Sequence, residues 1–190
     1  MLQSDITAPN ASGADLRALR RARGVTLADL AARLGRSVGW LSQVERDLSQ
    51  PGAADLAQIA QALDVPPSLL IAQPAAPGDE AGYIVRSGAR RAIDAGKPGL
   101  TEELLSPDLT DDFEMIHSTF APGAAAPGPV SRPTQEVAYI VSGKLDLTID
   151  GRAFTARAGD SFRIRGDTFA WSNPYPQPAV AIWVIAPPVY

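Results

Sequence analysis

The chain has 190 residues, with 17 Lys and Arg, 21 Asp and Glu, and a formal net charge of −4 at pH 7. It has no cysteine, which excludes disulfides, thiol catalysis and zinc–thiolate sites. No charged-then-apolar leader opens it, and its longest apolar run, residues 179–186, is too short to cross a bilayer. With 45% apolar residues, we expect a soluble cytoplasmic protein of one domain or two small ones, with no membrane partner.

After a loose tail, the first regular pattern has the period of helices. One apolar helical face consists of residues at i, i+3, i+4 and i+7: Leu27, Leu30, Ala31 and Leu34. Thr26 precedes this run as an N-cap, and Gly35 follows it, where a left-handed residue ends a helix most easily. Ser37 then provides a second N-cap. The order is that of a helix-turn-helix motif.

The outer surface of the second helix suits contact with DNA. Leu41 and Val44 form a narrow inward stripe. The residues left outside are small at the start and polar further on: Ser37, Val38, Gly39, Ser42, Gln43 and Arg46. Such a surface can approach base edges in a major groove, where Gln pairs bidentately with adenine. The plainer alternative is an ordinary helical hairpin with a solvated polar face.

Charge and the flanking pattern favour the DNA-binding alternative. Residues 14–46 hold seven Arg and three acidic residues, and seven minus three gives a local charge of +4. A further helical face follows, and a short helix after two prolines completes five. Their apolar positions are Leu56, Ile59, Ala60 and Leu63, then Leu69 and Leu70.

This five-helix order over residues 14–71 resembles the Cro/phage-repressor (XRE) family of DNA-binding domains. The motifs that carry the resemblance are Thr26, Ala31 where two helices cross, Gly35 at the turn, Gln43, and Glu45-Arg46 followed by a turn and Pro51. The resemblance implies that DNA is contacted by Thr26, Ser37, Val38, Gly39, Gln43 and Arg46. It also implies an ion pair between Arg20 and Glu45. Asp47 departs from the family, which often has Gly there.

Residues 72–82 have linker composition, and a second domain is expected at 83–190. Between residues 136 and 164 the period becomes two, with Asp150-Gly151 as a hairpin turn. The short strands and their evenly spaced turns predict an all-β sandwich or barrel.

The spacing of Glu136, Gly143, Gly151 and Gly159-Asp160 resembles the cupin family, a double-sheet jelly-roll barrel. The match is best over residues 118–188. The resemblance places the family's metal ligands at Val130, Arg132, Glu136 and Ala170. Only the Glu is a usual ligand, so we expect no metal and no cofactor. His117 is interpreted as a hydrogen-bonded strand histidine.

The barrel interior is a second candidate site. Its candidate ligand-binding residues are Arg132, Glu136, Tyr139, Arg163, Arg165 and Trp171. Buried guanidinium groups need partners, so a small anionic effector is one hypothesis. In the plainer alternatives, the arginines reach solvent or pair with acidic side chains, and the aromatic residues belong to the core or to a dimer face.

The whole order resembles the XRE–cupin transcriptional regulators. It implies a non-enzymatic, sequence-specific regulator that binds a double-stranded DNA operator as a homodimer and senses a small molecule. Two alternatives remain open: a cupin-type enzyme with an accessory helical domain, and a DNA-binding protein whose cupin is purely structural.

Overall fold

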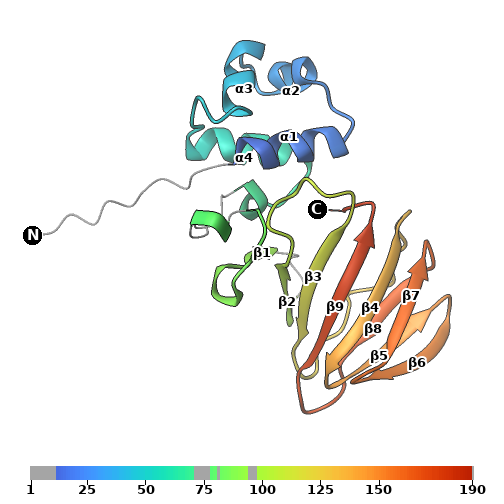
Figure 1. The fold of residues 1–190 in the computed structure, drawn as a ribbon. Coiled ribbons are helices and arrows are strands. Elements are labelled where there is room, and N and C mark those ends of the chain that lie inside the picture. The colour runs from blue at the N-terminus through green and yellow to red at the C-terminus, as the bar shows by residue number, and fades with distance from the viewer. Residues whose placement is uncertain (1–11, 71–77, 81, 94–97, 190) are drawn as a thin grey trace, which may run out of the picture. The chain divides into compact units, whose positions relative to one another are not determined.

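A computed structural model describes residues 12–70, 78–80, 82–93 and 98–189 (Figure 1). The chain forms two compact units, one helical and one a β-barrel. The helical unit runs to Ile84 and includes residues 108–110, and the barrel unit comprises residues 85–107 and 111–189. The expected N-terminal tail and most of the expected linker at 72–82 lie outside the described residues, apart from a short 3₁₀ helix, η2, at Gly78–Glu80.

The described part of the helical unit has four α-helices, not the five that we expected. They are α1 (Gly13–Ala22), α2 (Leu27–Arg33), α3 (Val38–Val44) and α4 (Ala53–Leu63). The fifth element is a 3₁₀ helix, η1 (Pro67–Leu70). Pro66 and Pro67 have no N–H to donate, and the short piece closes as a single turn in which Leu69 N–H donates to the carbonyl of Pro66 at 3.0 Å. No described helix is long and apolar enough to span a membrane.

The ends of α2 and α3 follow from their sequence. Thr26 and Asp29 cap α2 reciprocally in a capping box. Gly35 has φ +61°, and Arg36 N–H reaches back to the carbonyl of Ala31 at 3.0 Å, which closes α2 in a Schellman turn. The Ser37 hydroxyl accepts from Trp40 N–H at 3.1 Å and starts α3. The turn between the two helices is therefore fixed at both sides by backbone hydrogen bonds.

The barrel consists of two antiparallel sheets (Figure 1). The six-stranded sheet has the order β1-β2-β3-β9-β4-β7, with bounds Arg91–Ile93, Leu100–Leu104, Glu114–Phe120, Ala179–Ala186, Gln135–Ser142 and Ser161–Arg165. The three-stranded sheet has the order β6-β5-β8, with bounds Arg152–Arg157, Lys144–Ile149 and Phe169–Ser172. A short 3₁₀ helix, η3 (Ser87–Ala89), precedes β1.

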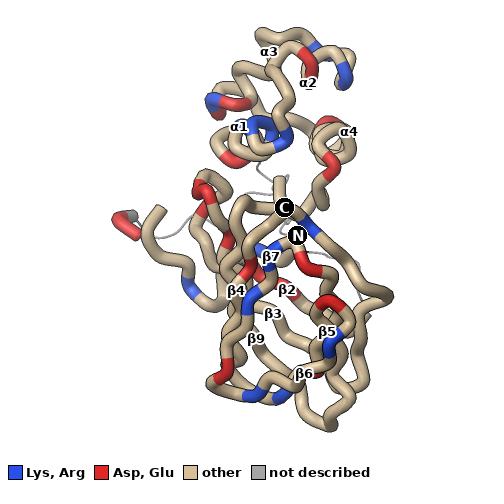
Figure 2. Tube along the Cα trace, turned by 90° about the vertical axis from the view of Figure 1, so that its right-hand side faces the viewer, with Lys and Arg blue, Asp and Glu red and all other residues tan. Residues whose placement is uncertain are grey.

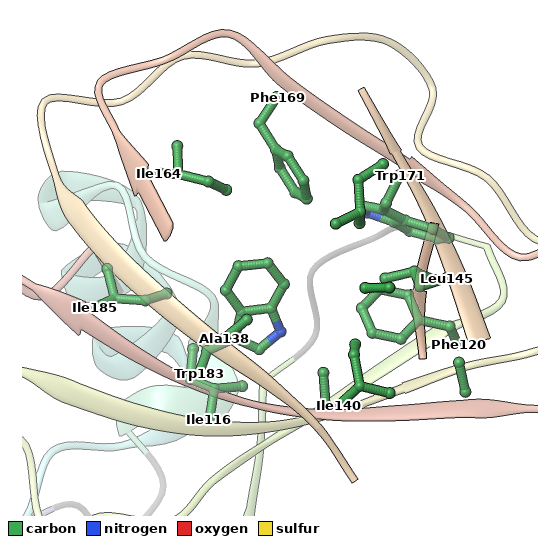
Figure 3. Packing of buried hydrophobic residues seen from close by; sticks show 14 residues of the cluster. Ile116, Phe120, Ala138, Ile140, Leu145, Ile164, Phe169, Trp171, Trp183 and Ile185 are labelled. Atoms are coloured by element: carbon green, nitrogen blue, oxygen red, sulfur yellow. The ribbon is translucent and has the colours of Figure 1, made fainter. Parts of the chain in front are cut away.

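Alternation along the strands builds the barrel core (Figure 3). On β5, Leu145 and Leu147 are buried, as their period of two predicts. Phe120 and Trp171 meet edge to face with ring centroids 4.7 Å apart. Trp183 packs between Phe162 and Phe169, with ring centroids 5.3 and 5.8 Å away. The aromatic rings thus join the two sheets across the interior.

Candidate DNA-binding surface and barrel cavity

The outer face of α3 has the composition that the helical period predicts. Leu41 and Val44 are buried against the other helices, which leaves the remaining positions toward solvent. The exposed positions proposed for DNA contact are Thr26, Ser37, Val38, Gly39, Gln43 and Arg46, and Ser42 is half-buried. Five of the seven residues belong to α3 or its N-cap, while Arg46 follows α3 and Thr26 is the N-cap of α2.

Several of these polar groups already have local hydrogen-bond partners. The Thr26 hydroxyl accepts from Asp29 N–H at 3.1 Å, and the Ser37 hydroxyl caps α3. Arg46 Nε donates to the carbonyl of Ser42 at 3.2 Å. Within the described part of the chain, no protein group hydrogen-bonds to the side chain of Gln43. Its amide is therefore free to use a donor and an acceptor together on one base edge.

The expected ion pair between α1 and the end of α3 is confirmed. Arg20 Nε and Nη2 donate to the two carboxylate oxygens of Glu45 at 2.6 and 2.9 Å, and Nη1 donates to the carbonyl of Val25 at 2.8 Å. The two side chains are only 10% and 6% exposed. The hydrogen bonds that Arg20 donates to Glu45 raise the pKa of Arg20 above its usual value. This bidentate pair fixes α3 on α1.

Asp47 makes a second link between α1 and the end of α3. Its backbone is left-handed, with φ +57°, which Asp tolerates better than most residues. Its Oδ1 accepts from the N–H of Gly13 at 2.8 Å. A Cβ on Gly13 would lie 2.4 Å from the carbonyl oxygen of Val44, so the two helix ends pack backbone to backbone.

Figure 2 marks the basic and acidic positions along the chain. The arginines of the helical unit differ in the contacts that their side chains make. Arg36 donates to Asp55 at 2.7 Å and lies over the ring of Trp40, 5.1 Å from its centroid. Arg33 donates to the carbonyl of Ala62 at 3.2 Å. Arg17, Arg21 and Arg46 are exposed. The exposed cations supply charge that nearby phosphates would attract without regard to sequence.

The barrel holds a partly open cavity of about 90 Å³ between its two sheets. Its wall is mostly apolar and aromatic, with Phe120, Phe169, Trp171 and Trp183 among the lining residues. Its charged lining residues are Glu102, Arg132, Glu136 and Asp167. A mostly apolar pocket with a few polar groups has the character of a small-molecule site.

The six residues proposed for ligand contact separate into two groups. Arg132, Glu136 and Trp171 line the cavity. Tyr139, Arg163 and Arg165 are exposed on the outer side of the sheet and do not line it, contrary to our expectation.

The physical reason is the period of two. Along β4 the inner positions go to Glu136, Ala138 and Ile140, which are buried. Along β7, Phe162 and Ile164 point inward, so the two arginines between and after them point out.

The residues at the cupin metal positions do not fit a metal ion. Val130 has no ligand atom in its side chain and Arg132 is a cation, which leaves Glu136 as the one metal-ligating side chain among these positions. Ala170 does not line it, because β8 turns Phe169 and Trp171 inward. His117 is on β3, and its Nδ1 lies 3.8 Å from Glu103. Within the described residues, no group of three or more His, Asp or Glu side chains could hold a metal ion.

We did not predict from the sequence that Glu102 and Asp167 line the cavity, or that Glu114 lies close to it. Glu102 accepts from the Ser118 hydroxyl at 3.0 Å, while Asp167 also lines the wall. Ile185 on β9 pairs with Glu114 on one neighbouring strand, β3, and with Glu136 on the other, β4. The signal was available for Glu114, because it holds an inward position in the alternation of β3.

Burial raises the pKa of Glu114 to about 7, although Val189 N–H donates to it at 3.1 Å and Arg132 opposes the shift. Glu102 and Glu136 add to the rise, since their negative charges disfavour a third one nearby. Glu136 itself accepts from the Thr134 hydroxyl at 2.6 Å. The carboxylates and Arg132 therefore act on one another inside the barrel.

Comparison with known proteins agrees with both units. The family model of a helix-turn-helix domain matches residues 12–72, and the family model of the cupin domain matches residues 116–185. The HTH-type transcriptional regulator SutR of Escherichia coli K12 is 31% identical over 154 residues, which cover 80% of each chain. The chain belongs to the HTH-type transcriptional regulators that carry a cupin domain.

Other relatives extend this comparison. The HTH-type transcriptional regulator PuuR of Escherichia coli K12 is 25% identical over 167 residues, covering 86% of this chain and 88% of PuuR. The solved structure of KdgF from Halomonas sp. superimposes with a TM-score of 0.50 and 18% identity, covering 57% of this chain and 96% of KdgF. That likeness concerns the fold alone.

Proposed function

We propose that this DNA-binding transcriptional regulator reads an operator with the outer face of α3, and that its barrel both dimerises the protein and senses a small molecule. The observation that carries the proposal is the geometry of α3. Its outer face is exposed while the buried Arg20–Glu45 pair and the fixed turn hold it in place. A rigid helix with small and amide side chains outward suits a major groove.

The proposed roles on this surface differ among the residues. Gln43 reads a base, because its amide is free and Gln pairs bidentately with adenine. Arg46 contacts phosphate, and the small residues Val38 and Gly39 let the helix approach the bases closely. Ser37 keeps its capping role and donates its hydroxyl proton to the backbone of the operator. The Thr26 hydroxyl caps α2 and donates its proton to Asp29, so its contact with the operator requires this proton to turn from Asp29 to a phosphate.

A homodimer is supported by an apolar patch on the outer face of the six-stranded sheet. We call it the sheet patch, and it comprises Met115, Val137, Tyr139, Val141 and Val184, each at least 36% exposed. Met115, Val184 and Val137 lie side by side in one row across β3, β9 and β4. A contiguous apolar surface of this kind marks an interaction site, and a second copy would bring together two helix-turn-helix motifs for a two-fold operator.

The proposed sensing role is supported by the barrel cavity, in which Arg132 would bind an anionic group of the effector. We propose a non-enzymatic role for the barrel, because the residues at the cupin metal positions do not fit a metal. Since the operator is chromosomal DNA, the proposal includes a cytoplasmic location.

The test is selection of duplexes from a random library by the full-length protein. The proposal predicts enrichment of two related half-sites in inverted orientation, about 10 base pairs apart from centre to centre or a multiple of that spacing. Affinity for the enriched duplex should fall steeply with salt. Failure to enrich any sequence would contradict sequence-specific reading, and enrichment of a single half-site would contradict the dimer.

A further inference from the structure

The barrel cavity holds unsatisfied donors together with an excess of acceptors. We propose that its ligand is a small zwitterion of the α-amino acid class, with a carboxylate, an ammonium group and a short apolar body. This inference rests on the proposed sensing function and replaces a purely anionic effector with one that carries both charges.

Two donors in the cavity point to the carboxylate. Arg132 is half-buried and, within the described residues, its guanidinium makes no hydrogen bond or ion pair with another protein group. Trp183 is only 6% exposed and its indole N–H has no partner. Figure 3 shows its ring extending from β9 into the interior of the barrel. Leaving a buried donor unpaired is costly, and a ligand carboxylate would provide acceptors for these donors.

The acceptors in the same space call for a positive group. Glu102, Glu136 and Asp167 line the cavity with one arginine, Arg132. Glu114 lies close enough for Glu102, Glu136 and Arg132 to act on its pKa. The internal hydrogen bonds occupy one oxygen each of Glu102 and Glu136. A simple anion would add negative charge to a wall that already has a surplus of it. An ammonium group offsets that surplus and donates to the free oxygens.

The size and wall of the cavity limit the rest of the ligand. The accessible volume of about 90 Å³ is several times the roughly 10–15 Å³ that a cavity needs to hold one water, so there is room for a small ligand. An amino acid with a short side chain is a ligand of that kind. Ile164, Ile185, Phe169 and Trp171 line the cavity and would receive this side chain by apolar burial.

Three probes of matched shape separate the two charged groups. L-valine has both, isobutylamine lacks the carboxylate, and 3-methylbutanoate lacks the ammonium group. We would measure the melting temperature and binding heat of the full-length protein, first with all twenty proteinogenic amino acids and then with these three compounds. At least one amino acid should stabilise the protein and bind about tenfold or more tightly than its amine or acid analogue, as expected for a hydrogen-bonded charge.

Variants assign each end of the ligand. Arg132→Gln and Trp183→Phe should lower the affinity for the amino acid toward that for its amine analogue. Glu136→Gln should lower it toward that for the acid analogue, and Glu102→Gln repeats this test at a less buried position. Arg163→Gln is the control, because this arginine is exposed on the outer side of the same sheet. This substitution should change neither the affinity for the amino acid nor the affinities for its two analogues.

The proposal of a zwitterionic ligand would be overturned if the protein bound the amino acid and its acid analogue with equal affinity. It would also be overturned if Arg132→Gln and Arg163→Gln changed the affinity for the amino acid equally. The failure of all twenty amino acids to stabilise the protein would overturn it as well. If acids alone shift operator affinity, the sensing function survives without this ligand class. If none of these compounds shifts it and the operator is still bound, the barrel serves dimerisation only.

Discussion

At the residue scale, the Arg20–Glu45 pair is a buried, bidentate contact in the helical unit. Glu45→Ala leaves a guanidinium buried without its bidentate partner, and we expect the unfolding free energy of the helical unit to fall by about 3–5 kcal/mol. Chemical denaturation followed by circular dichroism measures this loss.

The control is the exposed pair of Arg36 and Asp55, whose side chains are 49% and 18% exposed. Arg36→Ala should cost about 0–1 kcal/mol, plus the loss of its contact with Trp40. Similar small losses in both variants would show that the Arg20–Glu45 pair adds little to stability.

Glu114 should make the stability of the barrel depend on pH. Its pKa is about 7 in the fold against an ordinary 4.5, so the folded state holds a proton that the unfolded chain releases. Stability is therefore fully present below pH 4.5, falls as the pH rises, and is lower by about 3 kcal/mol once the pH exceeds 7. Glu114→Gln removes the titration and keeps an acceptor for Val189 N–H.

Denaturation of the wild type and of Glu114→Gln at acidic and at mildly alkaline pH tests this. Relative to the wild type, the variant should gain stability as the pH rises from about 4.5 to about 7, and the difference should level off above pH 7. A difference that is the same at both pH values would mean that Glu114 titrates normally in the fold.

The sequence could predict residues whose role depends on a local pattern. The helical period and the position of Gly35 indicated the inner and outer faces of α2 and α3. The pairing of Arg20 with Glu45, 25 residues away, came from the family resemblance and not from any local pattern. Glu102 was missed because the sequence does not distinguish a buried charge from a solvated one. Glu114 was missed although its position in the alternation of β3 indicated that it points inward.

At the element scale, two glycines in the barrel turns separate backbone strain from steric contact. Gly143 and Gly151 both have left-handed backbones, with φ +78° and +74°. A Cβ on Gly151 would meet nothing within 4 Å, whereas one on Gly143 would lie 2.5 Å from the carbonyl oxygen of Pro178. Gly151→Ala should therefore cost about 1–2 kcal/mol for the strained backbone alone.

Gly143→Ala should cost clearly more, because β4 and β9 must also separate where the chain enters β5. Thermal melts of the two variants check the order. Equal melting temperatures would show that the turn at Gly143 adjusts without disturbing β9.

The elements were predictable where both the turn and the alternation are clear. Asp150 and Gly151, with φ +47° and +74°, form the predicted hairpin between β5 and β6. β1 and β2 were not predicted, because Glu102 takes an inward position in β2 and breaks the apolar alternation. The expected fifth helix is a 3₁₀ turn, Pro67–Leu70, within the described residues.

At the scale of the whole molecule, the sheet patch should hold two copies together. Val137→Lys places a charge at its centre, and we expect the protein to change from dimer to monomer in sedimentation equilibrium while its circular dichroism stays the same. Phe154→Lys is the control, because Phe154 is 50% exposed but lies on β6 of the other sheet. A Val137→Lys protein that remains dimeric would remove the sheet patch as the interface.

The order of two domains was predictable from the change of period and from composition. The interior of the barrel was not, because the phase of a strand decides which side chains face inward, and the arginines of β7 were assigned to the wrong face. The charge inside the cavity depends on which alternate side chains of each strand face inward. The expected anionic effector rested on three arginines, of which one lines the cavity.

The most direct test of the account is the affinity of Gln43→Ala for the selected operator and for random duplex DNA, at one fixed salt concentration. If the outer face of α3 reads bases, binding to the operator should weaken by roughly 1–3 kcal/mol and binding to random DNA should change little. Gln58→Ala, the same change at an exposed position of α4, should leave both affinities unchanged. Equal losses on operator and random DNA, or no loss on either, would contradict the assignment of sequence reading to Gln43 and α3.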